Sequence, residues 1–203
     1  MTKRGYHHGN LRQALVEAAL ALIAERGPQG FSLSEAAKQA DVTPAAVYRH
    51  FAGRDELLAE VARQGYEIFA ALMEYAFDEG KPSALAAFEA TGRAYLAFAR
   101  KYPGHYVAMF ESGLSPQAWP ELAPVATKAR DVLERAAAGL SGHLPPDRRP
   151  PPSMVSAHVW AMSHGVVELY MRGAAKSPFA PEDLLEAGIG IYLRGLGLLP
   201  PDK

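Results

Sequence analysis

Hydrophobic residues recur at helical spacing along the whole chain. Between residues 11 and 26 they follow one another at intervals of three, four and seven, which places them on one face of a helix that Gly27-Pro28 ends. No stretch alternates between polar and apolar residues with a period of two, and a run of prolines between residues 145 and 152 predicts an extended connection. We therefore predict an all-α fold of about nine helices, at residues 11–26, 33–40, 44–51, 55–77, 85–99, 106–110, 122–140, 153–172 and 181–198.

Two of the predicted helices are short, and each begins with a start signal. Ser32-Leu33-Ser34-Glu35 forms a capping box, in which the hydroxyl of Ser32 accepts from the amide of Glu35 while the carboxylate reaches back. Thr43-Pro44 combines a hydroxyl cap with a proline at the first helical position, where its missing N–H has no cost. Two short capped helices after a longer amphipathic one are typical of a helix-turn-helix, whose second helix enters the major groove of DNA.

The side chains on the second short helix suit a DNA groove. Hydroxyl, phenol and imidazole groups, together with the free amides of a helix N-terminus, can donate hydrogen bonds to phosphate oxygens. Small alanines allow the helix backbone to approach the base edges. This combination favours a recognition helix, and its residues are Thr43, Ala45, Ala46, Tyr48, Arg49 and His50.

The charge of the chain is near neutral overall but positive at its N-terminal end. The formal net charge is −1 for 203 residues, yet residues 1–54 carry seven Lys or Arg against four acidic residues, a local charge of +3. A DNA-binding surface must therefore be local. Lys3 and Arg4 precede the first helix, and we expect them to form an arm that reaches the minor groove.

Composition and motifs exclude several other classes of protein. The chain has no Cys, which excludes disulfides, thiolate zinc sites, iron–sulfur clusters and a Cys nucleophile. It also lacks a phosphate-binding glycine loop, a nucleophile elbow and a His-Glu-x-x-His motif, so we predict no enzyme, no cofactor and no metal site. No apolar run is long enough to span a membrane, and the N-terminal segment lacks the apolar core of a signal peptide, so we expect a cytoplasmic protein.

Three segments of the N-terminal part together resemble a known family. Residues 31–37, 42–51 and 54–58 resemble the N-terminal domain of TetR-family transcriptional regulators. Residues 5–12, with Trp160 and His164-Gly165, resemble the subgroup of that family named for a Trp-His-Gly motif. The resemblance implies a homodimer that binds a palindromic operator in double-stranded DNA and leaves it when a small-molecule effector enters the C-terminal domain. Repression is the commoner outcome in the family.

The resemblance divides the expected DNA contacts between phosphates and bases. Arg49 can bond to guanine O6 and N7, whereas Ala46 offers only a methyl contact to thymine. Asp41 lies where the family's turn usually has Gly, and Asp tolerates a left-handed backbone better than most residues. Phosphate contacts are expected from Thr43, Tyr48, His50 and Arg54, base contacts from Ala45, Ala46 and Arg49, and further contacts from Ser32 and Pro44.

Large apolar side chains at helical spacing fill much of the C-terminal part. Such residues are often plain core, but kinks at Pro103-Gly104 and Pro120 favour imperfect packing and an apolar pocket between helices. His164 and Glu168 are four residues apart on one predicted helix face and can bond to each other. The candidates for effector binding are Phe69, Met73, Tyr95, Phe98, Tyr106, Met109, Phe110, Trp119, Trp160, His164 and Glu168.

The last two predicted helices combine glycines with large apolar residues. Small residues permit close helix crossing, and a mostly apolar terminal helix needs a partner to cover it. In the TetR family these helices pair with their copies in a four-helix bundle, and we expect a homodimer here whose two-fold axis matches a palindromic operator. The expected dimer contacts are Gly165, Leu184, Gly188, Ile191, Tyr192 and Gly195.

These features divide the chain into a DNA-binding domain, residues 1–54, and a ligand-binding and dimerisation domain, residues 55–203. The expected function is that of a ligand-responsive repressor, released from its operator by a small apolar or amphipathic effector. One alternative is a helical small-molecule-binding or protein-interaction module that has lost DNA binding, and another is an enzyme. Tyr48, Arg49, His50 and Arg54 favour DNA binding, because such residues have no evident role in a core.

Overall fold

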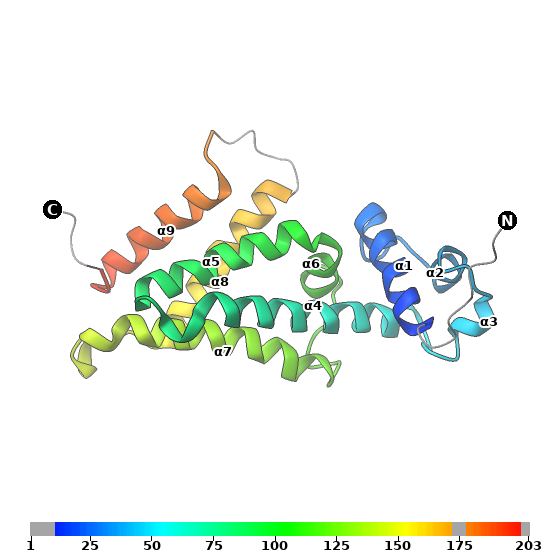
Figure 1. Cartoon of the computed structure of the whole chain (residues 1–203), viewed down its shortest axis with the longest axis horizontal. Coiled ribbons are helices and arrows are strands. Elements are labelled where there is room, and N and C mark those ends of the chain that lie inside the picture. Colours follow the sequence, from blue (N-terminus) through cyan, green and yellow to red (C-terminus); the bar gives the residue numbers. More distant parts are fainter. Residues whose placement is uncertain (1–10, 172–177, 200–203) are drawn as a thin grey trace. The chain divides into compact units, whose positions relative to one another are not determined.

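The computed structural model describes residues 11–171 and 178–199, which contain nine α-helices and no strand (Figure 1). The predicted all-α class is thus confirmed. Across the same residues, no helix has both the length and the apolar character that a membrane span requires. The helices are α1 (Leu11–Arg26), α2 (Leu33–Gln39), α3 (Pro44–Val47), α4 (Arg54–Phe77), α5 (Ala84–Lys101), α6 (Pro103–Phe110), α7 (Leu122–Leu140), α8 (Pro152–Met171) and α9 (Pro181–Gly195).

The helices form two compact units. The first unit contains the residues up to Glu67 together with Tyr102–Pro124, and therefore α1, α2, α3, the N-terminal part of α4, and α6. The second unit contains Ile68–Lys101 and the residues from Val125 onward, and therefore the rest of α4 with α5, α7, α8 and α9. The sequence predicts a DNA-binding domain that ends at residue 54 and a ligand-binding domain that begins at residue 55. This division stays a prediction.

The core of the first unit is built from α1, α4 and α6. Leu15 of α1 and Leu57 of α4 are fully buried. Helix α6 packs closely on α1, because a Cβ added at Gly104 would lie only 3.1 Å from the backbone oxygen of Leu20. Helix α4 also packs closely on α6: a Cβ added at Gly65 of α4 would lie only 2.6 Å from the sulfur of Met109 of α6. Helix α6 therefore shares a core with the helix-turn-helix, although it is distant in sequence.

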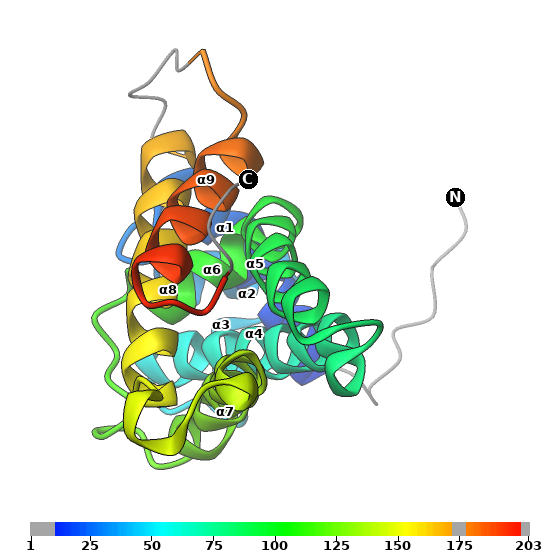
Figure 2. The same ribbon diagram turned by 90° about the vertical axis from the view of Figure 1, so that its left-hand side faces the viewer.

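The second unit is a bundle of helices around an aromatic core. Helices α8 and α9 lie side by side, as both ribbon views show (Figures 1 and 2), and α5 packs on both of them. Phe69 of α4 and Phe88 and Phe98 of α5 are fully buried there. Large apolar residues at helical spacing have thus formed core, which is their usual role.

Several predicted limits differ from the structure: the helix predicted at 106–110 begins at Pro103, and the last helix ends at Gly195 and not at residue 198. Two further corrections concern local backbone geometry. Helix α3 ends at Val47 and does not continue to residue 51. The proline-rich segment is not extended throughout, because Pro146–Arg148 forms a 3₁₀ turn and Pro152 begins α8. Proline lacks an N–H and has a fixed φ, which the first position of a helix or turn accepts without loss.

Candidate nucleic-acid interface

The start of α2 has the capping box that the sequence predicts. The amide of Glu35 donates to the hydroxyl of Ser32 at 3.3 Å, and the amide of Ser32 donates to the Glu35 carboxylate at 2.9 Å. Arg26, the last residue of α1, donates to the same carboxylate at 2.8 Å. The pKa of Glu35 is lowered mainly by the hydrogen bonds from Ser32 and to a smaller extent by the hydrogen bond from Arg26. This carboxylate therefore joins the end of α1 to the start of α2.

The turn after α2 is left-handed at Asp41. Its φ is 55°, and the amide of Val42 donates to the carbonyl of Ala37 at 3.0 Å while the amide of Asp41 donates to that of Lys38 at 3.2 Å. This pair of bonds is a Schellman motif, in which glycine is the usual left-handed residue. The sequence-based expectation that Asp41 adopts this backbone is confirmed.

Substitutions at Asp41 should change stability according to their tolerance of this backbone. We expect Asp41→Val to lower the free energy of unfolding by about 1–2 kcal/mol, because a β-branched residue is strained at positive φ. Asp41→Gly should raise it by a few tenths to about 1 kcal/mol. Urea unfolding of the three proteins measures both changes, and equal stability of the Val variant and the wild type would contradict the role given to this turn.

Helix α3 is a single turn of α-helix followed by a tighter turn. Thr43 occupies the N-cap position, but its hydroxyl makes no capping hydrogen bond, so that part of the prediction is wrong; Pro44 does hold the first helical position. Beyond Val47 the chain continues through a turn in which the amides of His50 and Phe51 donate to the Val47 carbonyl at 2.8 and 3.0 Å. We call residues 43–51 the recognition segment.

The recognition segment has an exposed and a buried side. Tyr48 is 61% exposed and Arg49 is also exposed, whereas Ala46 is only 7% exposed and faces the core beside Val47 and Phe51. The expected methyl contact of Ala46 with thymine therefore does not fit this conformation, because the helical period turns that position inward. The other predicted DNA contacts are exposed or half-buried: Ser32, Thr43, Pro44, Ala45, Tyr48, Arg49, His50 and Arg54.

Three cationic residues outside the recognition segment are also predicted to contact DNA: Lys3, Arg4 and Arg54. Arg54 donates to Asp55 at 2.6 Å, so a phosphate at this position would compete with a carboxylate. Lys3 and Arg4 lie outside the described residues. The roles given to these residues in DNA binding stay predictions.

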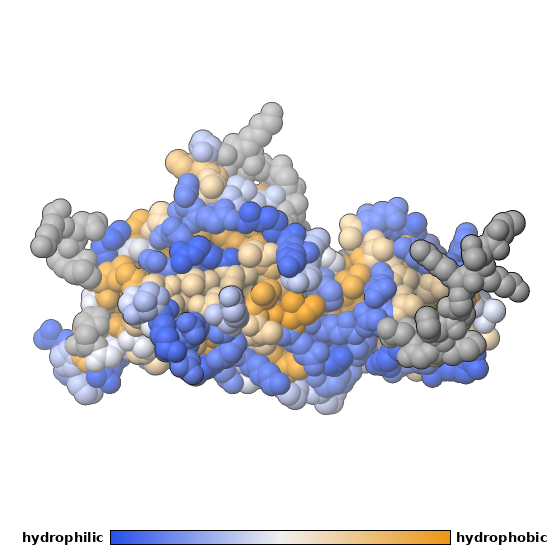
Figure 3. Space-filling view, viewed as in Figure 1, coloured by the Kyte–Doolittle hydropathy of each residue, from blue (hydrophilic) through white to orange (hydrophobic). Residues whose placement is uncertain are grey.

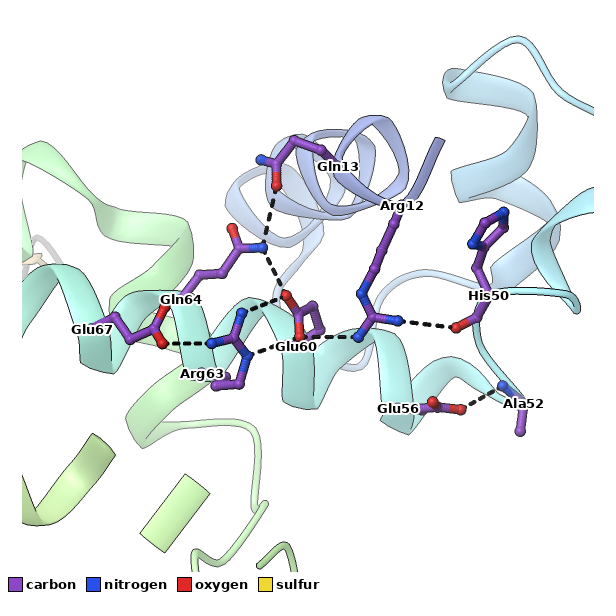
Figure 4. Close-up of polar contacts among 9 residues, drawn as sticks. All are labelled: Arg12, Gln13, His50, Ala52, Glu56, Glu60, Arg63, Gln64 and Glu67. Carbon is purple, nitrogen blue, oxygen red and sulfur yellow. Dashed lines mark hydrogen bonds and ion pairs between the residues drawn. The ribbon is translucent and has the colours of Figure 1, made fainter. Parts of the chain in front are cut away.

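A polar network that sequence reasoning missed joins α1, α4 and the recognition segment (Figure 4). Arg12 of α1 donates to the His50 carbonyl at 3.3 Å and to Glu60 of α4 at 3.1 Å. Glu60 also accepts from Arg63, at 2.8 and 3.0 Å, and from Gln64 at 2.9 Å. The sequence offered one signal for this network, a charged residue within an apolar helical pattern. It could not indicate the partner, because Arg12 and Glu60 are 48 positions apart.

Opposing effects set the protonation of Glu60. Burial alone would raise the pKa of this carboxyl, but hydrogen bonds from Arg63, Gln64 and Arg12 outweigh burial and lower it to about 2. The Arg63 guanidinium is stabilised in turn, which raises its pKa. Glu60 and Arg63 are therefore both charged at neutral pH.

The low pKa of Glu60 predicts a specific loss of stability in acid. A carboxyl whose pKa falls on folding, here from 4.5 to about 2, stabilises the protein above pH 4.5, and this contribution disappears as the pH falls toward 2. In Glu60→Gln the free energy of unfolding should therefore change less steeply with pH between about 5 and 2.5. Urea unfolding at several pH values measures the slope. Equal slopes for Glu60→Gln and wild type would contradict the assigned pKa.

The predicted effector-binding residues fall into both units. In the second unit Phe69 is the centre of an aromatic cluster, with its ring centroid 5.2 Å from Tyr95, 4.9 Å from Phe98 and 5.8 Å from Trp160. Such spacings are those of packed ring pairs, so the cluster is core in this conformation. The second unit holds Phe69, Met73, Tyr95, Phe98, Trp160, His164 and Glu168, and the first holds Tyr106, Met109, Phe110 and Trp119.

The polar edge of the aromatic cluster is His164. Its Nδ1 is 2.8 Å from the hydroxyl of Tyr95 and shares a hydrogen bond with it. Burial lowers the pKa of His164, and the charge of Glu168 opposes that effect. The two residues therefore interact electrostatically, as their spacing of four on one helix suggests.

The outward side of α8 and α9 carries most of the predicted dimer contacts. Ile191 is 69% exposed, and Leu184, about two turns earlier along α9, is also exposed. Nothing lies within 4 Å of a Cβ added at Gly165 or Gly195, whereas Gly188 faces the sulfur of Met162 at 3.6 Å. His158 and Tyr192 share a hydrogen bond of 2.8 Å between these helices. We call this side the α8–α9 face.

The fold and the recognition segment define a helix-turn-helix protein. A model described as "Bacterial regulatory proteins, tetR family" matches residues 15–61, and one described as "Tetracyclin repressor-like, C-terminal domain" matches residues 88–192. The second match alone covers more than half of the chain. The protein belongs to the TetR family, which places it among regulatory proteins and not among enzymes.

Individual relatives share part of the sequence or the fold. An uncharacterized HTH-type transcriptional regulator of Haemophilus influenzae is 34% identical over 73 residues, which span 36% of this chain and 39% of that protein. A protein with unknown function from Rhodococcus sp. RHA1 is 27% identical, with a TM-score of 0.80 over 95% of this chain and 98% of that chain. AibR, in complex with isovaleryl coenzyme A and operator DNA, has the same fold at 18% identity, with a TM-score of 0.69 over 89% of this chain and 97% of that chain.

Proposed function

We propose that the protein is a ligand-responsive repressor that binds a palindromic operator as a homodimer and is released by a small apolar or amphipathic effector. The observation that carries this proposal is the two-sided recognition segment. Ala46, Val47 and Phe51 anchor one side in the core, while Tyr48 and Arg49 are exposed. Side chains of this kind, held on a helix-turn-helix and free of any core role, suit contact with a DNA groove. Such a regulator acts in the cytoplasm, where bacterial DNA lies.

The expected DNA contacts are of two kinds: phosphate contacts that position the protein on the duplex, and base contacts that recognise the sequence. The Tyr48 hydroxyl donates to a phosphate oxygen, which orients the protein on any duplex. Arg49 can bond bidentately to guanine O6 and N7 in the major groove, which selects a base. With Ala46 turned inward, Arg49 and Ala45 remain the candidates for base contacts.

The α8–α9 face supports the homodimer. Hydrophobic residues gather in groups between hydrophilic ones on the side of the molecule drawn in Figure 3, and apolar atoms make up much of any protein surface. The α8–α9 face differs because its small and apolar residues repeat at helical spacing on two adjacent helices, which suits close packing against a second copy. Its exposed small or apolar residues are Met154, Ala157, Ala161, Gly165 and Leu169 of α8, and Leu184, Ala187, Ile191 and Gly195 of α9.

The aromatic cluster with His164 is the proposed effector site. AibR, a protein of the same fold, has been seen with both isovaleryl coenzyme A and operator DNA. In the present chain the cluster rings are in mutual contact, so an effector that enters must displace at least one of them. Phe69 belongs to α4, the helix that begins at Arg54 directly after the recognition segment. Displacement of Phe69 would therefore act on the helix next to the DNA contacts.

Effector binding would shift an equilibrium between two spacings of the paired recognition segments. Half-sites on DNA lie about 34–36 Å apart, and only one spacing of the dimer fits them. An effector that favours the other spacing weakens operator binding, and by reciprocity the operator weakens effector binding by the same factor.

Selection of genomic fragments by the purified protein, at two salt concentrations, tests the proposal. Phosphate contacts lose affinity with salt, whereas a specific site remains bound at about 10⁻⁸ to 10⁻¹¹ M. We expect an enriched inverted repeat that survives the higher salt. Weak, sequence-independent recovery that disappears with salt would contradict DNA regulation and favour a helical ligand-binding module that has lost DNA binding.

A further inference from the structure

We propose that Glu60, acting through Arg12, positions the recognition segment for specific DNA binding, which makes both residues positioning residues. This inference rests on the proposed function, because it assigns these side chains a role in that binding. Neither residue needs to touch DNA. Glu60 holds Arg12, and Arg12 holds the carbonyl at the end of the recognition segment (Figure 4).

The recognition segment needs such support because it is short. Helix α3 has four residues, and a single helical turn is not stable in water by itself. The buried residues Ala46, Val47 and Phe51 hold one side of the segment by packing. The carbonyls of Ala46 and Val47 accept backbone bonds within the turn, and the guanidinium of Arg12 supplies the bond to the carbonyl of His50, at the end of the segment.

Arg12 contacts the end of the segment in two ways. One guanidinium nitrogen donates to the His50 carbonyl at 3.3 Å, and the guanidinium carbon lies 4.6 Å from the centre of the Phe51 ring. The other terminal nitrogen donates to Glu60 at 3.1 Å. The planar fork of arginine makes these contacts at once, whereas the single ammonium of lysine cannot reproduce them.

Glu60 is held more firmly than its partner. It is 9% exposed and is the one Asp or Glu that is buried among the described residues. Burying a carboxylate is costly, and an apolar side chain would often be as stabilising at such a site. Arg63 and Gln64 bind the same carboxylate from α4 itself, and Gln64 also donates to Gln13 of α1 at 3.2 Å. These bonds lock the orientation of Glu60, which then fixes Arg12.

The position of the held carbonyl explains why specific binding should depend on it. His50 directly follows Tyr48 and Arg49, the two exposed side chains proposed to contact DNA. Bidentate readout of a base requires a defined geometry, whereas attraction to phosphates tolerates small displacements. A loosened recognition segment should therefore lose specific affinity and keep most of its non-specific affinity.

The chain offers a matched control for this test. Glu67 accepts from Arg63 at 2.6 Å on the same helix, but its side chain is half exposed, and Arg12 bonds to Glu60 instead. Glu67→Gln removes a charge from the same network without releasing Arg12. We expect Glu60→Gln to weaken the hold on Arg12, because it removes the carboxylate charge, and Arg12→Lys to remove the guanidinium that donates to the His50 carbonyl.

Two measurements on the full chain test the inference. The first compares affinity for the selected operator with affinity for a scrambled duplex, and we expect Glu60→Gln and Arg12→Lys to lower the ratio about tenfold while Glu67→Gln leaves it within about twofold. The second is amide hydrogen exchange without DNA, where we expect faster exchange at His50 and Phe51 in the first two variants only.

The outcomes separate this inference from the proposed function. If the wild type selects no operator, the proposed function fails, and hydrogen exchange still decides whether Glu60 positions the segment. The inference would be overturned if the amides of His50 and Phe51 exchanged no faster in Glu60→Gln and Arg12→Lys than in Glu67→Gln. It would also be overturned by equal losses of specific and non-specific affinity in Glu60→Gln, because these would indicate general destabilisation.

Discussion

Replacing Ile191 with aspartate is expected to convert the proposed homodimer into monomers and to lower affinity for the proposed operator by about 100-fold or more. Ile191 is 69% exposed on the α8–α9 face and has apolar neighbours on the same side of α9. Burying an unpaired carboxylate against a second copy costs several kcal/mol, and two-fold symmetry places the substitution in the interface twice. A monomer also loses the gain in affinity from engaging two half-sites at once.

Sedimentation velocity at several protein concentrations measures the first effect, and operator titration measures the second. Ile191→Val is the matched control, since it keeps an apolar side chain at the same position and should leave the dimer intact. A dimeric Ile191→Asp protein with unchanged operator affinity would show that the α8–α9 face is not the dimer interface.

Arg49→Ala is expected to relax base preference at one position of each half-site, with a loss of about 1–3 kcal/mol against the preferred base. Arg49 is exposed in the recognition segment and reaches outward beside Tyr48. Tyr48→Phe provides the comparison, because it removes one hydroxyl that is proposed to donate to phosphate. That variant should bind all sequences more weakly by a similar factor.

Binding to a panel of operators with single base changes separates the two roles. Arg49→Ala should flatten the profile at one base pair, whereas Tyr48→Phe should lower every affinity and keep the profile. Equal, sequence-independent losses from both substitutions would show that Arg49 contacts the backbone and reads no base.

Local sequence signals predicted much of the helix-turn-helix. The Ser32–Glu35 capping box formed as expected, because both of its bonds lie within four consecutive residues. Asp41 adopted the left-handed backbone that its place in the turn indicates. In each case the interacting atoms are close in sequence, so the residue types alone determine whether the contact can form.

The same reasoning failed where the outcome depended on a surface supplied by another element. The cap at Thr43 also failed although it is a local contact: the hydroxyl has the right chemistry and makes no capping bond. The helical pattern allowed Ala46 to face outward, but packing places it in the core. The aromatic residues at helical spacing gave no indication that some would belong to one compact unit and some to the other.

The amino-acid sequence by itself specified the all-α class, most helix limits, the recognition segment and the family resemblance, because these depend on hydrophobic period and on contacts between neighbours along the chain. The tertiary structure alone decided that Arg12 would meet Glu60 and His50, and that Phe69 would become the centre of a packed cluster. Pairings across 38 and 48 residues depend on how whole helices pack, and the pattern of a single helix contains no information about its partner.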